Sequence, residues 1–382
     1  MLTDKLRAWL YLTVKTNISR RKLFLLYKHF NSVLNIMNAS KDELEDTGIL
    51  TSDEMSSILC HDYSALTEYM GILQKNMVKV ISIECEAFPE MLREIPDPPL
   101  LLYCRGKFID LNKHLCIASV GSRNPSSYGR RMTYSIVKDL CRRGIIIVSG
   151  MAQGIDAVSH KAALDMNCPT VAFVANGVDI IYPRCNAELF KSLIKTGMVV
   201  SEYPLGTMPR NYYFPERNRL VAGVSKGVFI SEAKVKSGTS ITCSMALSQN
   251  KDVFALPGNV DSVLSGEPLR LIKEGACPVT EAGDILCHYK DLYSENLYTG
   301  NSDDEIIEVS LPLPSGENEK MPDIPKNLTN EEKILYVLKE KNLSIDEISV
   351  FSKITLEELN MLLLILEMDG KIKNDNGIYY LL

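Results

Sequence analysis

The feature that most constrains the fold is a regular alternation of short apolar runs with amphipathic stretches between residues 115 and 290. The apolar runs are rich in Ile and Val, and they are Leu115–Val120, Ile145–Val148, Thr170–Val174, Met198–Ser201, Gly227–Ser231 and Asp252–Leu256. The stretches of helical length between them are 127–143, 155–166, 186–195 and 239–250. Fully apolar strands that alternate with helices indicate a parallel sheet covered on both faces. We therefore expect an α/β fold whose ligand-binding residues lie just beyond the carboxyl ends of the strands.

The segments on either side of this region have different patterns. Apolar residues at helical spacing, such as Leu6, Leu10 and Val14, predict short helices before residue 75, with no strand before Val78. Residues 293–326 lose periodicity and carry prolines and charges, which is typical of an acidic flexible linker. The final segment predicts helices over 329–338, 344–351 and 355–368 and a hairpin that turns at 375–377, a pattern typical of a winged helix-turn-helix. The expected parts are a small helical (SAM-like) domain over 1–75, the sheet domain over 76–292, the linker over 293–326 and a winged-helix domain over 327–382.

The charge of the chain is unevenly distributed. The whole sequence has 42 Lys and Arg against 48 Asp and Glu, a net charge of −6, which at face value argues against a polyanionic partner. Residues 301–326 carry seven acidic and two basic residues, and residues 327–382 carry ten and six. The first 300 residues are therefore slightly basic, so a polyanion can still bind the sheet domain.

Cysteine usage and hydropathy predict the compartment. The ten cysteines are scattered without any CxxC pair, as expected of reduced thiols in the cytosol. The N-terminus lacks the uninterrupted apolar region of a signal peptide. The longest apolar run, Met361–Leu366, is far too short to span a membrane. We expect a soluble, cytoplasmic protein with no membrane partner.

Three strand-end loops contain small residues just before a helix. They are Gly121–Asn124, Ser149–Asp156 and Glu232–Ser240. Such turns present backbone N–H groups and the positive end of a helix dipole to an anion, although a glycine in a turn is more often ordinary turn chemistry. The candidate anion-binding residues are Gly121, Ser122, Arg123, Gly150, Gln153, Gly154, Lys234, Ser237, Gly238 and Thr239.

The second loop gives no evidence for a dinucleotide, a metal or a catalytic triad. Its glycines are four residues apart rather than in a GxGxxG pattern, and no acidic residue is placed for a ribose. Asp156 and His160 are four residues apart on the following helix and could pair, and the plainer alternative is a carboxylate at the helix start that holds one histidine in place. His160 is the only one of the five histidines near these loops. We therefore expect no cofactor and no metal site.

A fourth strand-end segment combines aromatic and basic residues. The sequence between Arg210 and Arg219 contains three consecutive aromatics flanked by arginines, and we expect a loop that Pro215 keeps stiff. Single-stranded nucleic acid binds to positive charge through its phosphates and to aromatic faces through its bases, whereas the plainer alternative is one buried aromatic with surface arginines. The candidates here are Arg210, Phe214, Arg217, Asn218 and Arg219. Together with the three loops, they favour a nucleotide or a nucleic-acid backbone as the ligand.

These motifs, in their order and spacing, resemble the bacterial DNA-processing protein A (DprA, also called Smf) family. The matching residues are Gly121–Arg123, Ser149–Asp156 with His160, Tyr182-Pro183, Ser201-Glu202, Phe214–Arg219, Ser237–Thr239 with Ile241-Thr242, and Pro257-Gly258. The resemblance covers residues 85–290 densely. One departure is Glu267-Pro268-Leu269, which stands where the family commonly has Gly-Thr-Asn.

The resemblance implies an extended Rossmann-like domain that binds single-stranded DNA, usually dimerises, and helps load the RecA recombinase during DNA processing and natural transformation. It implies no enzymatic turnover. By position, Arg123 would grip a phosphate, Phe214 would stack a base, and Arg217 and Arg219 would support that pocket. The Ser237–Thr239 turn would present backbone donors.

Two other functions compete with this interpretation. A Rossmann-like nucleotide-handling hydrolase would use Glu232 beside a glycine-rich loop, but the loop here lacks the expected double glycine. A regulator that reads duplex DNA would use the winged helix, but the presumed recognition helix, Thr355–Met368, contains Glu357, Glu358 and Glu367 and no Lys or Arg. Phosphates would be repelled by that helix, so a protein contact suits it better.

Overall fold

The computed structural model describes residues 3–235, 237–290 and 329–340, together with part of the chain between 343 and 381. The chain divides into two compact units, Met1–Leu311 and Pro312–Leu382, which we describe separately. The predicted linker over 293–326 lies outside the described residues.

The first unit begins with six helices, as the sequence predicts. Side chains that precede the helices cap them: the hydroxyl of Thr3 accepts a hydrogen bond from the N–H of Leu6, and Ser40 and Thr51 form capping boxes. The helices are α1 (Asp4–Val14), α2 (Arg20–Phe30), α3 (Val33–Asn38), α4 (Lys41–Asp46), α5 (Ser52–Leu59) and α6 (Ser64–Lys75). Their buried apolar side chains belong to the same core as one face of the sheet, so this helical segment packs directly on the sheet domain.

A nine-stranded sheet follows in the order β1-β2-β6-β5-β4-β3-β7-β8-β9. The strands are β1 (Val78–Ser82), β2 (Leu101–Gly106), β3 (Cys116–Val120), β4 (Ile146–Ser149), β5 (Thr170–Phe173), β6 (Met198–Ser201), β7 (Gly227–Ile230), β8 (Asp252–Ala255) and β9 (Cys277–Pro278). The six predicted runs are β3 to β8, and all of them are parallel. Strand β2 pairs antiparallel with both β1 and β6, which the sequence pattern does not reveal.

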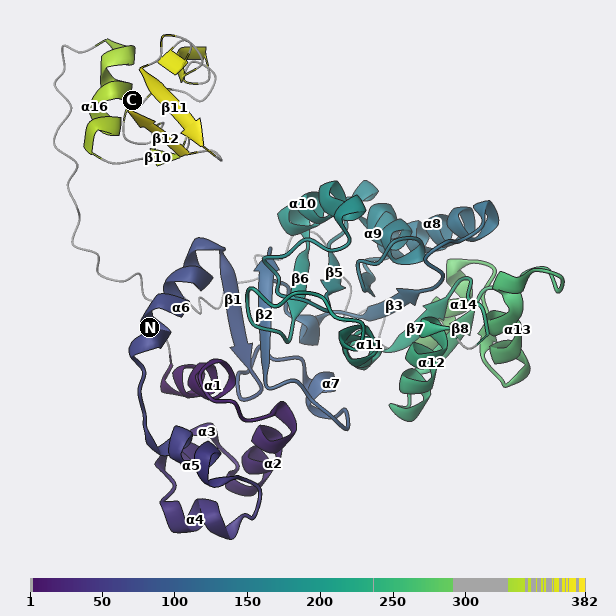
Figure 1. The fold of residues 1–382 in the computed structure, drawn as a ribbon. Helices are drawn as coiled ribbons and strands as arrows, with labels where there is room; N and C mark the ends of the chain where they lie inside the picture. Colours follow the sequence, from purple (N-terminus) through teal and green to yellow (C-terminus); the bar gives the residue numbers. More distant parts are fainter. Residues whose placement is uncertain are drawn as a thin grey trace. The chain divides into compact units, whose positions relative to one another are not determined.

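Helices cover both faces of this sheet (Figure 1). In Figure 1, α8 (Ser127–Arg142), α9 (Ile155–Asp165) and α10 (Ala187–Thr196) lie above the sheet, and α11 (Tyr213–Gly223) and α12 (Gly238–Ser248) lie below it. Shorter elements are α7 (Glu90–Arg93), α13 (Gly266–Lys273), α14 (Ala282–Leu286), η1 (Leu111–Lys113), η2 (Arg184–Asn186), η3 (Val263–Ser265) and η4 (Cys287–Tyr289). Strand residues alternate between the two apolar cores: Ile117 faces one and Ala118 faces the other. The expected α/β fold with a doubly covered parallel sheet is therefore confirmed.

The order of the strands reverses between β3 and β7. From β3 the chain adds β4, β5 and β6 on one side, and it then returns to add β7, β8 and β9 on the other. The connections leaving β3 and β7 consequently diverge and leave a crevice beyond the carboxyl ends of these two strands. Ligands bind at this switch point in open α/β sheets.

One sequence prediction about this edge is wrong. The segment 210–219 was expected to be a loop, but helix α11 begins at Tyr213 and includes Phe214, Arg217 and Arg219. Pro215 does not prevent the helix because it lies in the first turn, where a backbone N–H has no partner within the helix. The aromatic and basic side chains are therefore presented from a helix rather than from a stiff loop.

The second unit contains helix α16 (Asn330–Glu340) and a three-stranded sheet in the order β10-β12-β11, formed by Leu343–Ser344, Ile378–Leu381 and Ile372–Asp375. Pairing of Asp375 with Ile378 confirms the predicted hairpin. Ser344, expected to begin a helix, lies in β10. Much of the predicted helices over 344–351 and 355–368 lies outside the described residues.

Candidate functional site

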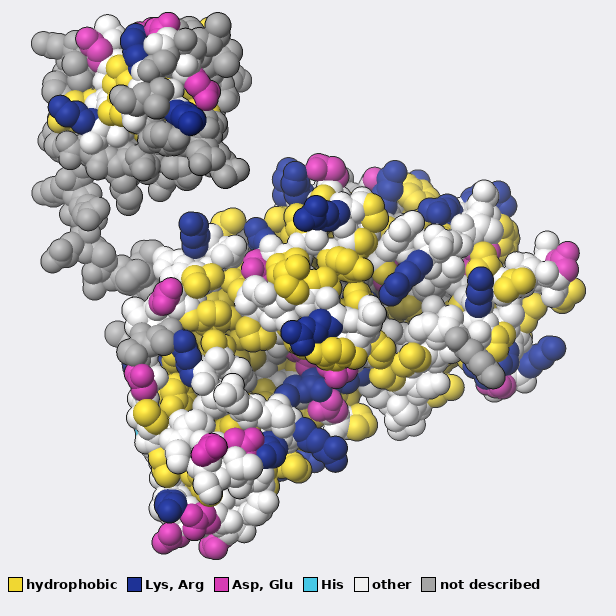
Figure 2. Space-filling view, in the orientation of Figure 1, with side chains coloured by type: hydrophobic (Ala, Val, Ile, Leu, Met, Phe, Trp, Pro, Cys, Tyr) yellow, Lys and Arg dark blue, Asp and Glu magenta, His cyan; other side chains and the backbone are white. Residues whose placement is uncertain are grey.

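A cleft of about 700 Å³ opens at the switch point of the sheet. Ten of the fifteen site residues predicted from the sequence line it: Gly121, Ser122, Arg123, Phe214, Arg217, Asn218, Lys234, Ser237, Gly238 and Thr239. Figure 2 shows a hollow between α11 and the start of α8, bordered by hydrophobic and basic side chains. The residues come from three separate strand-end connections, so the fold assembles them as the periodicity predicted.

Aromatic rings and an arginine form one wall of the cleft. The rings of Phe214 and Tyr182 have centroids 5.7 Å apart, and the guanidinium of Arg123 lies 5.5 Å from the centroid of Phe214. Arg123 is exposed and makes no ion pair with a described residue. Tyr182 was not among the predicted site residues, although its place after β5 was a signal that could have found it. This wall combines a π-face with a positive charge.

The connection after β3 is held by a buried carboxylate. Glu232, which follows β7, accepts hydrogen bonds from the backbone N–H of Ser126 at 2.8 Å and from its hydroxyl at 2.6 Å. The backbone carbonyl of Glu232 also accepts a bond from the N–H of Ser122 at 2.6 Å. The N-terminus of α8, one of the predicted anion sites, is therefore already occupied by an anion of the protein itself.

The connection after β4 is likewise satisfied internally. The carboxylate of Asp156 accepts hydrogen bonds from the N–H groups of Gly150 and Ala152, both at 3.2 Å. Burial raises the pKa of Asp156, while the charge of Arg217 and these two amides act in the opposite direction. The backbone amides of this loop that were predicted to bind an anion therefore already bind the carboxylate of Asp156. The predicted pairing of Asp156 with His160 is wrong, because the ring of His160 contacts Thr170 instead.

The two glycines of the same loop allow neighbouring groups to pack closely against its backbone. A Cβ atom at Gly150 would lie 2.5 Å from the guanidinium of Arg217, and one at Gly154 would lie 2.3 Å from the carbonyl oxygen of Ser122. Gly154 also has a φ of +91°, which side chains rarely adopt. Neither glycine lines the cleft, and Gln153 is exposed outside it. This loop therefore supports the wall of the cleft and contributes Ala152 and Asp156 to its surface, whereas its two glycines and Gln153 do not line it.

His160 is buried behind this loop. Its Nδ1 lies 2.8 Å from the hydroxyl of Thr170, which donates its own hydrogen to the carbonyl of Ile147. Nδ1 therefore carries the hydrogen, and Nε2 has no partner in the described part of the chain. Burial and the charge of Arg217 lower the pKa of His160 to about 3. The imidazole is neutral and serves the core, not acid–base chemistry in the cleft.

The two arginines of α11, Arg217 and Arg219, have different surroundings. Arg217 is buried and donates to the carbonyl oxygens of Gly150, at 2.6 Å, and of Phe173. Arg219 turns away from the cleft to Glu202, at 2.6 Å, and to Asp97. Arg217 lines and supports the cleft, as the family resemblance implied, whereas Arg219 does not.

Arg219 belongs to a cluster of ion pairs beneath the helical segment. Arg20, the first residue of α2, contacts Glu202 and lies 2.6 Å from Asp97. Glu202 is almost fully buried between the two arginines. This ionic cluster joins α2 to the end of β6 and is a structural element.

Arg210 also lies outside the cleft. Its guanidinium donates to the hydroxyl of Tyr212 at 2.8 Å. Tyr212 and Tyr203 both contact the ring of Tyr213, with centroids 4.5 and 4.1 Å away. These residues form an aromatic cluster next to the cleft.

The connection after β7 keeps unoccupied donors. The N–H of Ser237 bonds to the hydroxyl of Ser240 at 3.2 Å, but the N–H groups of Gly238 and Thr239 bond to no described residue. The hydroxyl of Ser237 lies in a capping box with Ser240 at the start of α12, and its hydrogen has no acceptor among the described residues. Lys234, which makes no ion pair with a described residue, is exposed on the same rim. Of the three predicted anion loops, this one retains free donors.

The departure at Glu267-Pro268-Leu269 is accommodated by the fold. These residues lie in the first turn of α13, and the N–H of Glu267 donates to the carbonyl of Ala233 at 3.1 Å. The buried carboxylate of Glu267 accepts two bonds from Arg270. The substituted segment thus braces the loop that carries Lys234.

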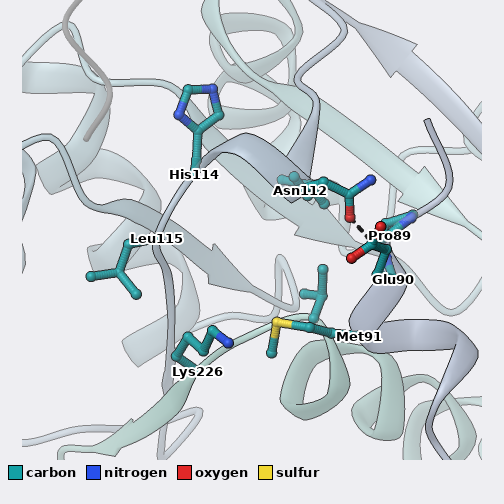
Figure 3. A pocket seen from close by; sticks show the side chains of 9 residues that line it. Pro89, Glu90, Met91, Asn112, His114, Leu115 and Lys226 are labelled. Carbon is teal, nitrogen blue, oxygen red and sulfur yellow. Dashed lines mark hydrogen bonds between the residues drawn. The ribbon is translucent and has the colours of Figure 1, made fainter. Parts of the chain in front are cut away.

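A second cavity, of about 170 Å³, lies at the opposite edge of the sheet, before β3 and β7 (Figure 3). It is lined by Pro89, Glu90, Met91, Leu111, Asn112, His114, Leu115, Val224 and Lys226. The side-chain oxygen of Asn112 accepts a bond from the N–H of Glu90 at 2.8 Å, and its amide group donates to the carbonyl of Phe88. The Asn112 side chain therefore holds the chain at the start of α7 in place, and none of the predicted site residues lines this cavity.

Within the described ranges, no group of three or more His, Cys, Asp or Glu side chains could hold a metal ion. No helix among the described residues has both the length and the apolar character needed to cross a membrane.

The fold and the cleft define an α/β protein of the doubly wound class, with a cleft lined by basic and aromatic side chains at its switch point. Residues 79–290 match the DNA recombination-mediator protein A family. The chain is 38% identical to the DNA processing protein DprA of Bacillus subtilis over 223 residues, which cover 58% of this chain and 75% of that protein. It is 37% identical to protein Smf of Escherichia coli, over 71% and 73% of the two chains.

Solved structures agree with this match. The structure of DprA from Streptococcus pneumoniae superposes with a TM-score of 0.60 at 31% identity and covers 74% of this chain and 97% of that one. The structure of DprA from Helicobacter pylori, which describes a single-stranded DNA binding mode, gives a TM-score of 0.51 at 28% identity over 56% and 97%. The chain belongs to the DNA recombination-mediator protein A family, and its function is DNA processing in recombination.

Proposed function

We propose that this protein binds single-stranded DNA in the cleft at the switch point. The observation that carries the proposal is the meeting of the Phe214–Tyr182 ring pair with the exposed charges of Arg123 and Lys234. Single strands bind through base stacking and phosphate contacts, and both elements are present here within one cleft. The Helicobacter pylori structure, which describes a single-stranded DNA binding mode, supports the same ligand.

The phosphate is assigned to the N-terminus of α12. Glu232 already occupies the N-terminus of α8, and Asp156 occupies the amides of the loop after β4. The free N–H groups of Gly238 and Thr239, the hydroxyl of Ser237 and the charge of Lys234 remain for a phosphate. The base then stacks on Phe214, and the amides of Asn218 and Asn211 lie in the cleft to hydrogen-bond its edge.

Base stacking accounts for a preference for single strands. In a duplex, the faces of the bases are stacked on one another, so Phe214 cannot reach them without unpairing the DNA. Fluorescence anisotropy with an oligo-dT and with a duplex of equal length tests this preference, with Arg123→Ala beside the wild type. We expect tight binding of the single strand by the wild type only. Equal affinity of both proteins for the single strand would refute the site.

The proposal does not include catalytic turnover. Glu232, the candidate catalytic carboxylate of a nucleotide hydrolase, is buried, and its two carboxylate oxygens accept hydrogen bonds from Ser126. His160 lies in the core with its pKa lowered by burial. Incubation with nucleoside monophosphates should release no free base, and release that is lost in Glu232→Gln would favour the hydrolase instead.

Further proposals concern assembly, RecA, the cellular compartment and the division into domains, and the first two rest on the family resemblance. The protein would assemble as a homodimer and help load the RecA recombinase onto the strand that it holds, in the cytoplasm. Its parts would be the helical domain over 1–75, the Rossmann-like domain over 76–292, the linker over 293–326 and a winged-helix domain over 327–382. Light scattering tests the dimer. Strand exchange on DNA coated with single-strand-binding protein, with and without this protein, tests RecA loading.

A further inference from the structure

Helix α8 carries a row of basic side chains on the side that it turns away from the sheet. Arg131, Lys138 and Arg142 are spaced by seven and four residues, which places them on one side of a helix. Ile136 and Leu140, on the other side, are buried in the core. Arg131 and Arg142 are exposed and Lys138 is half-buried. Figure 2 shows Lys and Arg side chains along the upper margin, over α8 to α10.

The charge of this face is only partly compensated, by Asp139 and by Asp165 of α9, whose carboxylate accepts a hydrogen bond from the hydroxyl of Tyr134 at 2.8 Å. Asp139 is the only acidic residue of α8, and it pairs with Arg142 at 2.6 Å. Both side chains of that pair are about half exposed, so the pair contributes little and can open for another anion. Arg131 and Lys138 make no ion pair with a described residue. The row therefore presents free positive charge to solvent.

The row continues directly from the cleft. Helix α8 follows the Gly121–Asn124 connection, which lines the cleft, and the residues from Gly121 to Lys138 include four basic residues and no acidic residue. Between Arg123 and Arg131, the exposed side chains are Asn124, Ser127, Tyr128 and Arg130, none of which repels a phosphate. The surface from the cleft to Lys138 is thus continuous in charge.

The dimensions suit a nucleic-acid backbone. At a rise of about 1.5 Å per residue, Lys138 lies roughly 10 Å and Arg142 roughly 16 Å along the helix from Arg131. Stacked nucleotides advance about 3.4 Å each along one strand, so these steps correspond to about three and five nucleotides. A single strand can therefore place a phosphate at each basic side chain without being stretched.

We propose that a single strand held in the cleft continues along the outward face of α8, with its phosphates on Arg131, Lys138 and Arg142. This inference rests on the proposed function, because it takes the cleft as the place where the strand is anchored. It extends the footprint by about five nucleotides and makes affinity depend on oligonucleotide length. An acidic protein partner is the competing occupant, and continuity with the cleft favours the strand.

The test compares two double variants that each remove two positive charges. Arg131→Gln/Lys138→Gln neutralises the α8 row, and Arg21→Gln/Lys28→Gln neutralises two exposed residues, also seven apart, on α2. Anisotropy titrations use a short oligo-dT of about 5 nucleotides and a long one of about 25, over a range of salt concentrations.

For the long oligonucleotide, we expect the α8 variant to lose about tenfold in affinity and its log–log salt slope to become shallower by about 1.4, at roughly 0.7 per lost phosphate contact. The short oligonucleotide should bind within about twofold of wild type, and the α2 control should match wild type with both. Wild-type affinity of the α8 variant for the long oligonucleotide, or an equal loss in the α2 control, would overturn the α8 path while leaving the cleft intact. Failure of the wild type to bind either oligonucleotide would instead refute the proposed function.

Discussion

Replacing Phe214 by Leu removes the aromatic face of the cleft and keeps an apolar side chain of similar size. The ring of Phe214 is paired with that of Tyr182 at 5.7 Å and lies under Arg123 at 5.5 Å. Stacking of one base on an aromatic side chain contributes about 1–3 kcal/mol. At about 1.4 kcal/mol per factor of ten, the dissociation constant for oligo-dT should rise roughly 5- to 150-fold.

The assay is an anisotropy titration of a labelled oligo-dT, with thermal unfolding as a check on the fold. Tyr212→Leu is the matched control because Tyr212 is 53% exposed on the neighbouring aromatic cluster and does not line the cleft. We expect the control to bind within about twofold of wild type. If Phe214→Leu binds like wild type, or if Tyr212→Leu loses as much affinity, the stacking site is wrongly placed.

Three other predictions follow from buried titratable groups. The low pKa of His160 means that folding favours its neutral form, so its contribution to stability is present above about pH 6.5 and is lost as the pH falls. In urea unfolding, the wild type should lose about 2 kcal/mol of unfolding free energy between pH 7 and pH 5. The variant His160→Gln should not show this loss. Glu232→Gln removes the charge at the start of α8 and should cost about 1–2 kcal/mol in unfolding free energy without weakening DNA binding, and a loss of binding would contradict its structural role. Glu202→Gln removes the buried carboxylate that Arg20 and Arg219 share and leaves Asp97 as their remaining acidic partner. It should cost about 1–3 kcal/mol in unfolding free energy, again with oligo-dT affinity unchanged in the same titration.

The parallel strands β3 to β8 could be predicted from the sequence because each one is marked by its own short apolar run. A run such as Ile145–Val148 has to be a buried strand, and the parallel arrangement brings the strand ends to one edge. The meeting of Arg123, Phe214 and Lys234 in one cleft follows from that arrangement alone. The sequence therefore predicted where the cleft lies and about half of the residues that line it.

The contacts that decide which loops remain free are long-range, and local spacing does not reveal them. Glu232 reaches Ser126 across more than one hundred residues, and Arg217 reaches Gly150 across 67. Arg219 looks equivalent to Arg217 in the sequence, yet the helical turn of α11 directs it to Glu202. The antiparallel direction of strand β2 could not be predicted, because it depends on the partners of β2 in the sheet rather than on the residues of β2 itself.

The most direct test of the central claim is to find which residues touch the bases of a bound single strand. An oligo-dT that carries photoreactive halogenated uracils can be crosslinked to the full-length protein, and the attached peptides can then be identified by mass spectrometry. We predict crosslinks at Phe214 and Tyr182, which should disappear when unlabelled single strand, but not duplex, is added in excess. Crosslinks that instead fall on the second cavity near Lys226, or in the Pro312–Leu382 unit, would contradict the account.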